Sequence, residues 1–374
     1  MDLQEKRDSK FMREAIRMAE KGLGRTAPNP AVGAVIVRDG VAVSRGYHRK
    51  AGAPHAEVDA LDKIGGRAEG ATLYVTLEPC NHTGRTPPCT KAILDGGVER
   101  VVVGMEDPNP EVKGGGCSFL AANNIEVKTG VLEPECRRLN EAFVKYVTSN
   151  RPFMIVKSAL TLDGWTATVE GDSKWITNER SRTFVHRLRD RVDAVMVGVG
   201  TILADDPQLT CRLKRGKGKD PLRIVVDTHL RTPLQARVLG LDSSAATLFV
   251  AGPEVNGKTV EEIENTGASV VVCPTGKAGI DMSALMDILG KRGITQVLVE
   301  GGAGIVGSLL REKLVDKFFI FKAPKLLGGG DGIPMAAGPG PRVMGKSLPL
   351  KDLKVRRFGN DILVECYPHY GAVP

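Results

Sequence analysis

Hydrophobic residues recur at two different spacings along the first 150 residues. Near the N-terminus they follow the helical period, which predicts a helix over residues 8–21 that begins at Asp8 or Ser9. The apolar runs 31–37 and 41–47 flank an Asp-Gly pair, which favours the tight turn of a β-hairpin. Helices and strands then alternate, with helices over 55–64, near 91, near 118 and over 134–147, and strands over 71–77, over 100–104 and near 125. This alternation predicts an α/β unit in which helices pack on a sheet.

A polar segment with a proline, residues 149–152, interrupts this pattern. Beyond it a second series of apolar strands is predicted over 153–160, 193–197, 222–226, 247–250, 269–273 and 296–299. Helices separate several of these strands, and an antiparallel hairpin over 354–358 and 361–366 ends the series. A chain of 374 residues is long for a single core. We therefore expect two α/β domains, residues 1–149 and 150–374.

The amino-acid composition indicates the cellular compartment in which the protein is expected. Hydrophobic residues make up 42% and charged residues 26% of the chain, and no segment approaches the ~18 apolar residues of a membrane span. Residues 1–10 lack the apolar stretch of a secretory signal. Seven cysteines, an odd number at low density, fit a reducing compartment better than a disulfide framework. We expect a cytoplasmic protein without a membrane partner, in which clustered cysteines indicate metal.

The formal net charge of +8 is compatible with nucleic acid, an acidic membrane surface or small anionic ligands. Basic residues are scattered, and the one dense group, residues 212–219, lies among glycines and is interpreted as a solvated loop. Aromatic residues at 5% leave few platforms for stacking bases. The charge distribution therefore favours small anionic ligands over nucleic acid.

His55, Cys80 and Cys89 form a compact set of candidate zinc ligands. A catalytic zinc takes about three protein ligands and keeps one position open, and one histidine with two thiolates is a known set. Residues two apart diverge on a regular helix, so His55 and Glu57 can share one site only where a helix begins. Pro54 supports such a helix start, because proline is tolerated at helix entry. A helix N-terminus also favours the thiolate form of a nearby cysteine.

Zinc lowers the pKa of bound water toward ~7, which makes hydroxide available for attack on an amino-bearing ring carbon. Glu57 would accept the proton and return it to the ring and to the departing ammonia. The sequence thus matches the known zinc-deaminase pattern, except that eight residues instead of two separate the cysteines. A structural zinc site or two buried cysteines are the alternatives.

Three segments carry a specific resemblance: Ala-Pro-Asn-Pro-Ala-Val-Gly at 27–33, His-Ala-Glu at 55–57, and Thr-Leu-Glu-Pro-Cys-Asn-His-Thr-Gly-Arg-Thr-Pro-Pro-Cys at 76–89. They resemble the bifunctional riboflavin-biosynthesis deaminase–reductases, in which the eight-residue spacing is usual. The resemblance implies a cytidine-deaminase-like three-layer domain that deaminates 2,5-diamino-6-(5-phosphoribosylamino)-4-pyrimidinone. Asn29, His48 and His82 then become candidate substrate contacts, although each could equally be a turn residue or a surface side chain.

In the second half, an apolar strand over 297–299 leads through Glu300 into Gly301-Gly302-Ala303-Gly304 and a helix over 305–311. Glycine permits close approach to a phosphate, and the start of a helix is electropositive. The segment lacks the full Gly-x-Gly-x-x-Gly pattern, and an ordinary tight turn is the alternative. A carboxylate at the C-terminal end of a strand commonly faces the ligand crevice of an open sheet. Glu300 is therefore a candidate ligand contact.

The resemblance extends through the second half by way of the segments 158–164, 173–177, 199–207 and 323–328. It implies a dihydrofolate-reductase-like domain that uses NADPH to deliver hydride to ribose C1′, leaving a ribitylamino chain. The implied cofactor contacts are Ala159, Trp175, Thr201, Asp205, Thr228, Gly302, Ala303, Gly304, Ile305, Val306, Gly307 and Ser308. The implied substrate contacts are Ser173, Arg189, Leu209, Arg212 and Glu300.

Arg189 and Arg212 could bind the sugar phosphate, since guanidinium groups offer paired donors to such anions. Lys157 and Asp205 are candidates for orienting the reacting end or supplying a proton. Structural alternatives stand beside these roles: Trp175 in a core, Arg189 on one face of a basic helix, and Asp205 capping a turn. We also expect a homo-oligomer with one zinc ion per deaminase domain.

Two other hypotheses remain open at this stage. A nucleic-acid base deaminase with an unrelated second domain would fit the zinc pattern and the positive charge. A non-catalytic zinc-stabilised scaffold would fit the ligands alone. Scattered charge and the reductase-like second half argue against the former.

Overall fold

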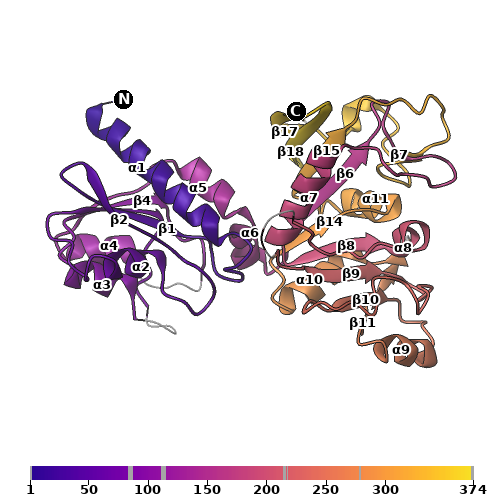
Figure 1. The fold of residues 1–374 in the computed structure, drawn as a ribbon, viewed down its shortest axis with the longest axis horizontal. Helices are drawn as coiled ribbons and strands as arrows, with labels where there is room; N and C mark the ends of the chain where they lie inside the picture. The colour runs from indigo at the N-terminus through magenta and orange to yellow at the C-terminus, as the bar shows by residue number, and fades with distance from the viewer. Residues whose placement is uncertain are drawn as a thin grey trace. The chain divides into compact units, whose positions relative to one another are not determined.

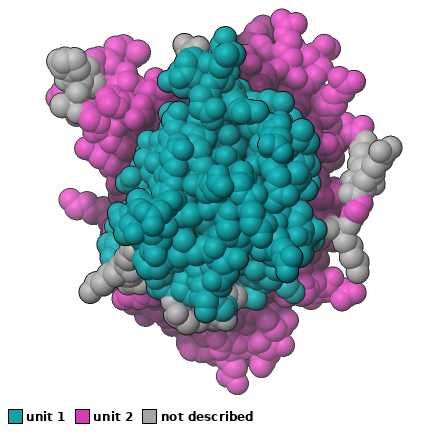
Figure 2. Space-filling view, turned by 90° about the vertical axis from the view of Figure 1, so that its left-hand side faces the viewer, with its two compact units in different colours: residues 1–150 teal, residues 151–374 magenta. Residues whose placement is uncertain are grey.

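The computed structural model describes residues 2–82, 87–110, 115–213, 216, 218–277 and 279–371. Residues 83–86 of the cysteine-containing motif and residues 214, 215 and 217 of the basic segment lie outside this part. The chain divides into two compact units, Met1–Asn150 and Arg151–Pro374, which Figure 2 colours separately. Among the described residues, no helix has the length and apolar character that crossing a bilayer requires.

Unit 1 is built on a five-stranded sheet in the order β2-β1-β3-β4-β5. Strand β1 runs antiparallel to both of its neighbours, whereas β3, β4 and β5 are parallel. The strands are β1 Gly33–Arg38, β2 Val41–Tyr47, β3 Thr72–Leu77, β4 Arg100–Met105 and β5 Glu126–Lys128. The helices are α1 Leu3–Ala19, the 3-10 turn η1 Glu20–Gly22, α2 Ala56–Asp62, α3 Cys89–Asp95, α4 Gly116–Ala122, α5 Glu133–Leu139 and α6 Glu141–Ser149.

Alternation along the strands gives this sheet two buried faces. In β1, Ala34 and Ile36 pack with α2, α3 and α4, whereas Val35 and Val37 pack with α1, α5 and α6. Figure 1 shows the sheet between these two groups of helices. Successive strand residues point to opposite faces, so a strand that is apolar at every position must be covered on both sides. Unit 1 is thus the predicted three-layer α/β fold.

Two helix predictions in unit 1 were wrong, one at its start and one in its middle. Helix α1 begins at Leu3 instead of residue 8, because Asp2 caps it and Glu5 completes a capping box. The single helix predicted over 134–147 is two helices that break at Asn140. The Asn140 side chain accepts the backbone N–H of Ala31 at 2.9 Å and donates to its carbonyl at 3.0 Å. This contact, 109 residues away in sequence, holds Asn140 outside regular helical geometry.

Unit 2 is built on a nine-stranded sheet in the order β11-β10-β9-β8-β14-β6-β15-β18-β17. Strands β11 to β15 in this order are parallel, and β18 and β17 form an antiparallel edge. Its strands are β6 Phe153–Leu160, β8 Ala194–Gly198, β9 Leu222–Val226, β10 Thr247–Ala251, β11 Ser269–Val272, β14 Gln296–Val299, β15 Lys317–Lys322, β17 Leu350–Phe358 and β18 Asp361–Pro368. Two further pairs are short: β7 Trp165–Ala167 with β16 Ile333–Pro334, and β12 Thr275–Gly276 with β13 Gly279–Ile280.

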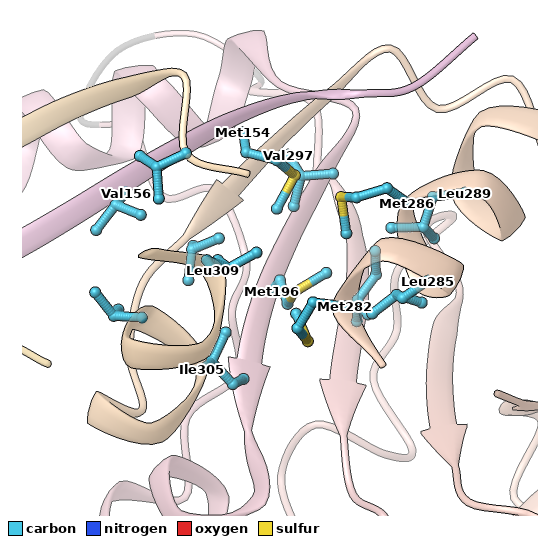
Figure 3. Close-up of a cluster of buried hydrophobic side chains, with 14 of the residues drawn as sticks. Met154, Val156, Met196, Met282, Leu285, Met286, Leu289, Val297, Ile305 and Leu309 are labelled. Carbon is cyan, nitrogen blue, oxygen red and sulfur yellow. The ribbon is translucent and has the colours of Figure 1, made fainter. Parts of the chain in front are cut away.

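Helices cover both faces of this sheet. They are α7 Glu179–Arg191, α8 Val199–Asp205, α9 Gly257–Glu264, α10 Met282–Lys291, α11 Ala303–Arg311 and the 3-10 turn η2 Met344–Lys346. Figure 3 shows the core that α10 and α11 form with strand residues such as Met154, Met196 and Val297. On the opposite face, Phe184 of α7 meets Phe319 of β15 with ring centroids 5.8 Å apart. Strand β15 lies between β6 and β18 within the sheet. It was not among the strands predicted from the sequence.

Asp8, the predicted cap, is instead a buried carboxylate on α1. It accepts two hydrogen bonds from Arg100, at 2.9 and 3.0 Å, one from Tyr74 at 2.9 Å and one from Lys128 at 3.2 Å. Burial raises the pKa of Asp8, but the hydrogen bonds from Arg100, Tyr74 and Lys128 outweigh it and lower that pKa to about 2. The group ties α1 to β3, β4 and β5.

We predict that Asp8→Asn lowers the free energy of unfolding of unit 1 by about 3 kcal/mol, because it removes the buried counter-charge of Arg100 and Lys128. Both tryptophans, Trp165 and Trp175, lie in unit 2, so their fluorescence follows unit 2 while far-UV circular dichroism follows both units. Urea titrations should show the dichroism transition moving to lower urea and the fluorescence transition unchanged.

The folded-state pKa of Asp8 is depressed from 3.8 to about 2, so its contribution is complete above about pH 5 and fades as pH falls toward 2. Glu133→Gln is the matched control, because it breaks an exposed ion pair with Arg137 worth about 0.5 kcal/mol. An Asp8→Asn shift no larger than that of Glu133→Gln would contradict the account.

Candidate active sites

The start of helix α2 is fixed by its close approach to strand β2. A Cβ atom on Gly46 of β2 would lie 2.1 Å from the carbonyl oxygen of Ala56, so only glycine lets the two backbones pack this closely. His55 is the N-cap residue with extended backbone, and Glu57 lies in the first turn with 3% of its surface exposed. The change from extended to helical backbone lets two residues two apart face one site, as the sequence predicted.

The two cysteines reach this site from neighbouring elements. Cys80 follows the C-terminal end of β3, and Cys89 is the first residue of α3. His55 Nδ1 lies 3.2 Å from Cys89 Sγ and 3.5 Å from Cys80 Sγ, and the three donor atoms are all within 4.8 Å of one another. Zinc–sulfur bonds of about 2.3 Å and zinc–nitrogen bonds of about 2.0 Å at tetrahedral angles require a spacing near 3.6 Å. The spacing and the soft donor set therefore fit a zinc ion.

Electrostatics at this site favour bound metal. The hydrogen bond with Cys89 lowers the pKa of Cys80 to about 4, whereas the same shared bond and burial raise the pKa of Cys89. The hydrogen bond with Cys80 also raises the pKa of His55. A metal that replaces the shared protons relieves this competition, because its ligands must be deprotonated. Burial raises the pKa of Glu57 to about 7, which suits a group that both takes and gives a proton.

His48 and Asn29 lie beside the three donor residues. The His48 ring packs edge-on against His55, with centroids 5.3 Å apart, and its Nε2 lies 3.1 Å from Asn29 Nδ2. The Pro54 carbonyl fixes the other ring nitrogen at 3.1 Å, and burial lowers the pKa of His48. His82 is exposed and interacts with Asp107. Asp107, which the sequence reading missed, is buried enough for its pKa to rise.

In unit 2, the predicted residues gather where three parallel strands end. Strand β14 lies between β8 and β6, and the chain leaves β8 toward β9 but β14 toward β15. Such a reversal opens a crevice at the C-terminal ends of the strands. Glu300 follows β14 there, and its N–H donates to the Met196 carbonyl of β8 at 3.0 Å. Lys157 of the neighbouring strand β6 lies 3.9 Å from the Glu300 carboxylate.

Glu300 and Arg189 form a buried two-point ion pair. Arg189 on α7 donates from Nε at 2.5 Å and from Nη2 at 3.1 Å to the two carboxylate oxygens, and its Nη1 donates to the Thr210 carbonyl at 2.9 Å. Burial raises the pKa of Glu300, but the charges of Arg189 and Lys157 outweigh burial and lower it overall. Burial lowers the pKa of Lys157 despite the charge of Glu300. The carboxylate is therefore ionised and rigidly held.

Arg212 lies in the segment after α8, close to this pair. Its Nη1 donates to Thr210 Oγ1 at 2.9 Å, and its backbone N–H donates to His186 Nδ1 at 3.2 Å. Burial, followed by the charges of Arg189 and Arg212, lowers the pKa of His186 to about 4, so this ring is a neutral acceptor. Leu209 nearby is buried in the left-handed region with φ of 56°. Sequence reasoning missed His186, although it lies one helical turn before Arg189.

Predicted cofactor and substrate contacts lie on helix α8 and beside it. Thr201 packs against Gly301, whose Cβ would lie 2.9 Å from Thr201 Oγ1, and Gly302 at φ of 84° turns the chain into α11. Ser173 Oγ lies 3.5 Å from Asp205, which also pairs with Lys174 Nζ at 3.1 Å. Trp175 is 63% exposed, so the core alternative for this residue is wrong.

In helix α11, backbone groups are more accessible to a cofactor than the side chains of residues 305–308. Ile305 and Val306 pack in the hydrophobic core, and a Cβ on Gly307 would lie 1.9 Å from the Ala337 carbonyl. Ser308 Oγ accepts from Arg311 at 3.1 Å. The amide groups of the first turn, at residues 303–305, are thus the groups available to a phosphate. Ala159 lies on β6, and Thr228 follows β9 beside Gly252 and Gly279.

Both halves of the chain match known families. Residues 5–105 match the cytidine and deoxycytidylate deaminase zinc-binding region. Residues 152–364 match the RibD C-terminal domain. Each match includes the residues of the corresponding site. Together they bear out the zinc-deaminase reading of unit 1 and the reductase reading of unit 2.

Similarity to individual proteins spans nearly the whole chain. The riboflavin biosynthesis protein RibD of Aquifex aeolicus is 43% identical over 96% of this chain and 97% of its own length. RibD of Escherichia coli is 38% identical over 95% and 98%. The crystal structure of a diaminohydroxyphosphoribosylaminopyrimidine deaminase/5-amino-6-(5-phosphoribosylamino)uracil reductase from Thermotoga maritima is 37% identical, with a TM-score of 0.85 over 98% of this chain and 100% of that one.

We predict that Cys89→Ser weakens zinc binding at least about 100-fold, because a hydroxyl is a poor substitute for a thiolate ligand. Zinc content of the purified full chain and competition with a chromophoric chelator measure this effect. Cys117→Ser is the control, since this cysteine of unit 1 lies outside the donor cluster and should leave zinc bound. Full zinc retention with unchanged affinity in Cys89→Ser would contradict the ligand assignment.

Proposed function

The chain belongs to the RibD family of bifunctional riboflavin-biosynthesis deaminase–reductases, and we propose that its two units act in turn on one phosphorylated pyrimidine. Unit 1 would convert 2,5-diamino-6-(5-phosphoribosylamino)-4-pyrimidinone to 5-amino-6-(5-phosphoribosylamino)uracil with release of ammonia. Unit 2 would then reduce the ribosyl group to the ribityl chain with NADPH. The T. maritima protein carries the names of both activities.

In unit 1, His55, Cys80 and Cys89 would hold one zinc ion. When bound, this ion supplies an acidic water molecule for attack on the amino-bearing carbon. Glu57 would take one proton from that water and pass it to the ring nitrogen. It would then carry the hydroxyl proton of the adduct to the amine, which leaves as ammonia while the ring carbon gains a carbonyl oxygen. Its raised pKa, near 7, keeps both directions of transfer accessible at neutral pH.

Asn29 and His48 would hold the pyrimidine beside Glu57. Asn29 Nδ2 lies 3.1 Å from His48 Nε2, and the Pro54 carbonyl oxygen lies 3.1 Å from His48 Nδ1. Burial keeps His48 neutral, so its ring stays a hydrogen-bonding group and adds no charge to the site. His82 is exposed, which fits a contact at the outer part of the substrate.

In unit 2, the crevice at the ends of β6, β8 and β14 would receive NADPH and the ribosylamine together. Backbone amides at the start of α11 would bind cofactor phosphate, with Ala159, Thr201, Asp205 and Thr228 as further cofactor contacts. When bound, NADPH supplies hydride to ribose C1′, and the ring oxygen gains a proton as the sugar opens. Lys157, beside Glu300, and Asp205, paired with Lys174, would orient the reacting end or supply that proton.

Phosphate binding was predicted for both Arg189 and Arg212, and we infer that the two residues have different roles. Three bonds from Arg189 go to Glu300 and Thr210, so its main task is to orient Glu300 toward the ribose. Arg212 is exposed and is held near the crevice by His186 and Thr210, which suits capture of the 5′-phosphate. Ser173 and Leu209 would be the remaining substrate contacts in unit 2. A homo-oligomeric state remains a prediction.

The observation that carries this proposal is the buried Glu57 beside three zinc donors in a chain whose second half is a reductase domain.

We predict that Glu57→Gln lowers ammonia release by at least about 10³-fold, because the proton shuttle is lost. Zinc content and NADPH oxidation with the deaminated pyrimidine should both stay unchanged. Glu69→Gln, at an exposed position of the same unit, is the control. Ammonia release at the wild-type rate from zinc-loaded Glu57→Gln would exclude this role.

We predict that Arg212→Gln raises the KM of the reductase for the phosphorylated pyrimidine about tenfold or more, because one charge-assisted contact is lost. The KM for the dephosphorylated compound should hardly change, and ammonia release should be unaffected. Arg187→Gln, on the exposed side of α7, tests whether charge alone matters. Equal effects on the phosphorylated and dephosphorylated compounds would rule out phosphate recognition by Arg212.

A further inference from the structure

Trp175 presents a large apolar ring to solvent on unit 2. Its surface is 63% exposed, and it lies in the segment between β7 and α7. Arg182 of α7 covers one face, with its guanidinium carbon 4.4 Å from the ring centroid. A contact on one face does not fix an exposed indole by itself. A single orientation also requires that the backbone of its segment is fixed by other contacts. The contacts of this segment show what holds it.

A strap formed by residues 323–328 runs beside Trp175. Lys325 Nζ donates to the Trp175 carbonyl oxygen at 2.5 Å. This hydrogen bond joins residues 150 positions apart and carries a full charge on its donor. The strap continues from β15 and leads toward β16, which pairs with β7, so Figure 1 shows both chain segments at the same end of unit 2.

The strap is itself anchored at both sides of Lys325. Asp163 accepts the backbone N–H groups of Leu327 and Gly328, each at 2.9 Å. The N–H of Leu162 donates to the Lys325 carbonyl at 2.7 Å. Two bonds to one carboxylate and one to the lysine's own backbone leave the strap little freedom to slide. The base of the Lys325 side chain is therefore a fixed point.

A second set of contacts anchors the Trp175 segment on its other side. Lys174 Nζ pairs with Asp205 at 3.1 Å, and Ser173 Oγ lies 3.5 Å from the same carboxylate. Arg182 donates to the Thr177 carbonyl at 2.5 Å while it stacks on the indole. These contacts fix the residues around Trp175, and Lys325 alone fixes its carbonyl among the described hydrogen bonds.

We propose that Lys325, anchored through Asp163, is a positioning residue: it fixes the backbone of Trp175, so that the indole stacked on Arg182 is a preformed platform for the dihydronicotinamide cofactor. The inference rests on the proposed cofactor contact of Trp175 and extends it, because it names the groups that set the orientation of the ring. A platform that is ordered before binding loses less entropy when the cofactor stacks on it. Removal of Lys325 should therefore weaken cofactor binding more than it slows hydride transfer.

The test uses Lys325→Met in the full chain and, for spectroscopy, in a Trp165→Phe background that leaves Trp175 as the sole tryptophan. Tryptophan emission overlaps dihydronicotinamide absorption, so cofactor stacked on Trp175 quenches its emission and gains emission of its own. The KM for NADPH should rise about tenfold with kcat changed less than about twofold, as expected for one lost charge-assisted hydrogen bond. Emission anisotropy of free Trp175 should fall, and energy transfer to bound NADPH should decrease at saturating cofactor.

Lys325→Arg keeps a donor and should restore most of the KM and the anisotropy, whereas Asp163→Asn should reproduce part of the loss. Lys346→Met, a lysine of η2 outside the strap, controls for removal of a positive charge. Thermal unfolding of each variant separates loss of stability from loss of orientation, and the midpoint for Lys325→Met should stay close to wild type.

Two contrary results are distinguishable. Absence of energy transfer from Trp175 to NADPH in the Trp165→Phe parent would overturn the proposed cofactor contact and the inference with it. Transfer in the parent together with unchanged transfer, anisotropy and NADPH KM in Lys325→Met would overturn the positioning role of Lys325 alone.

Discussion

Burial of ionisable side chains is the constraint on which both sites depend, since a charge removed from water must be paired or lose its charge. Three buried carboxylates, Asp8, Glu300 and Glu57, meet this constraint in different ways. Asp8 is paired with Arg100 and Lys128, and Glu300 with Arg189 and Lys157, so both stay ionised and fix the surrounding elements. Within the described residues, no lysine or arginine forms an ion pair with Glu57, and its pKa rises to about 7. Glu57 is the carboxylate for which we propose proton exchange.

The two units also place their chemistry by the same topological rule. Cys80 follows the C-terminal end of β3 in unit 1, and Glu300 follows the C-terminal end of β14 in unit 2. A strand end adjoins the start of a helix in each case, at α3 and at α11, where free backbone amides favour thiolate or phosphate. The similarity along nearly the whole chain joins these two sites in one enzyme family. It removes the alternative of a nucleic-acid deaminase with an unrelated second domain.

Features with a local cause could be predicted from sequence. Pro54 indicated the helix start that brings His55 and Glu57 together, and the apolar strand before Glu300 indicated its place at a crevice. Features that depend on distant partners could not be predicted. Asn140 breaks a helix through a contact with Ala31, and Arg189 pairs with Glu300, 111 residues away. The hydrogen bond from Lys325 to Trp175 likewise exists only once the sheet has brought β15 beside β6.

The central claim is that two separate sites in one chain act on successive forms of one molecule. The most direct measurement supplies the zinc-loaded protein with the diaminopyrimidine substrate and records ammonia and nicotinamide absorbance independently, with and without NADPH. The account predicts one ammonia per substrate whether or not NADPH is present, and one NADPH oxidised per substrate when both are supplied. Ammonia release without any NADPH oxidation, or NADPH oxidation that precedes ammonia release, would contradict it.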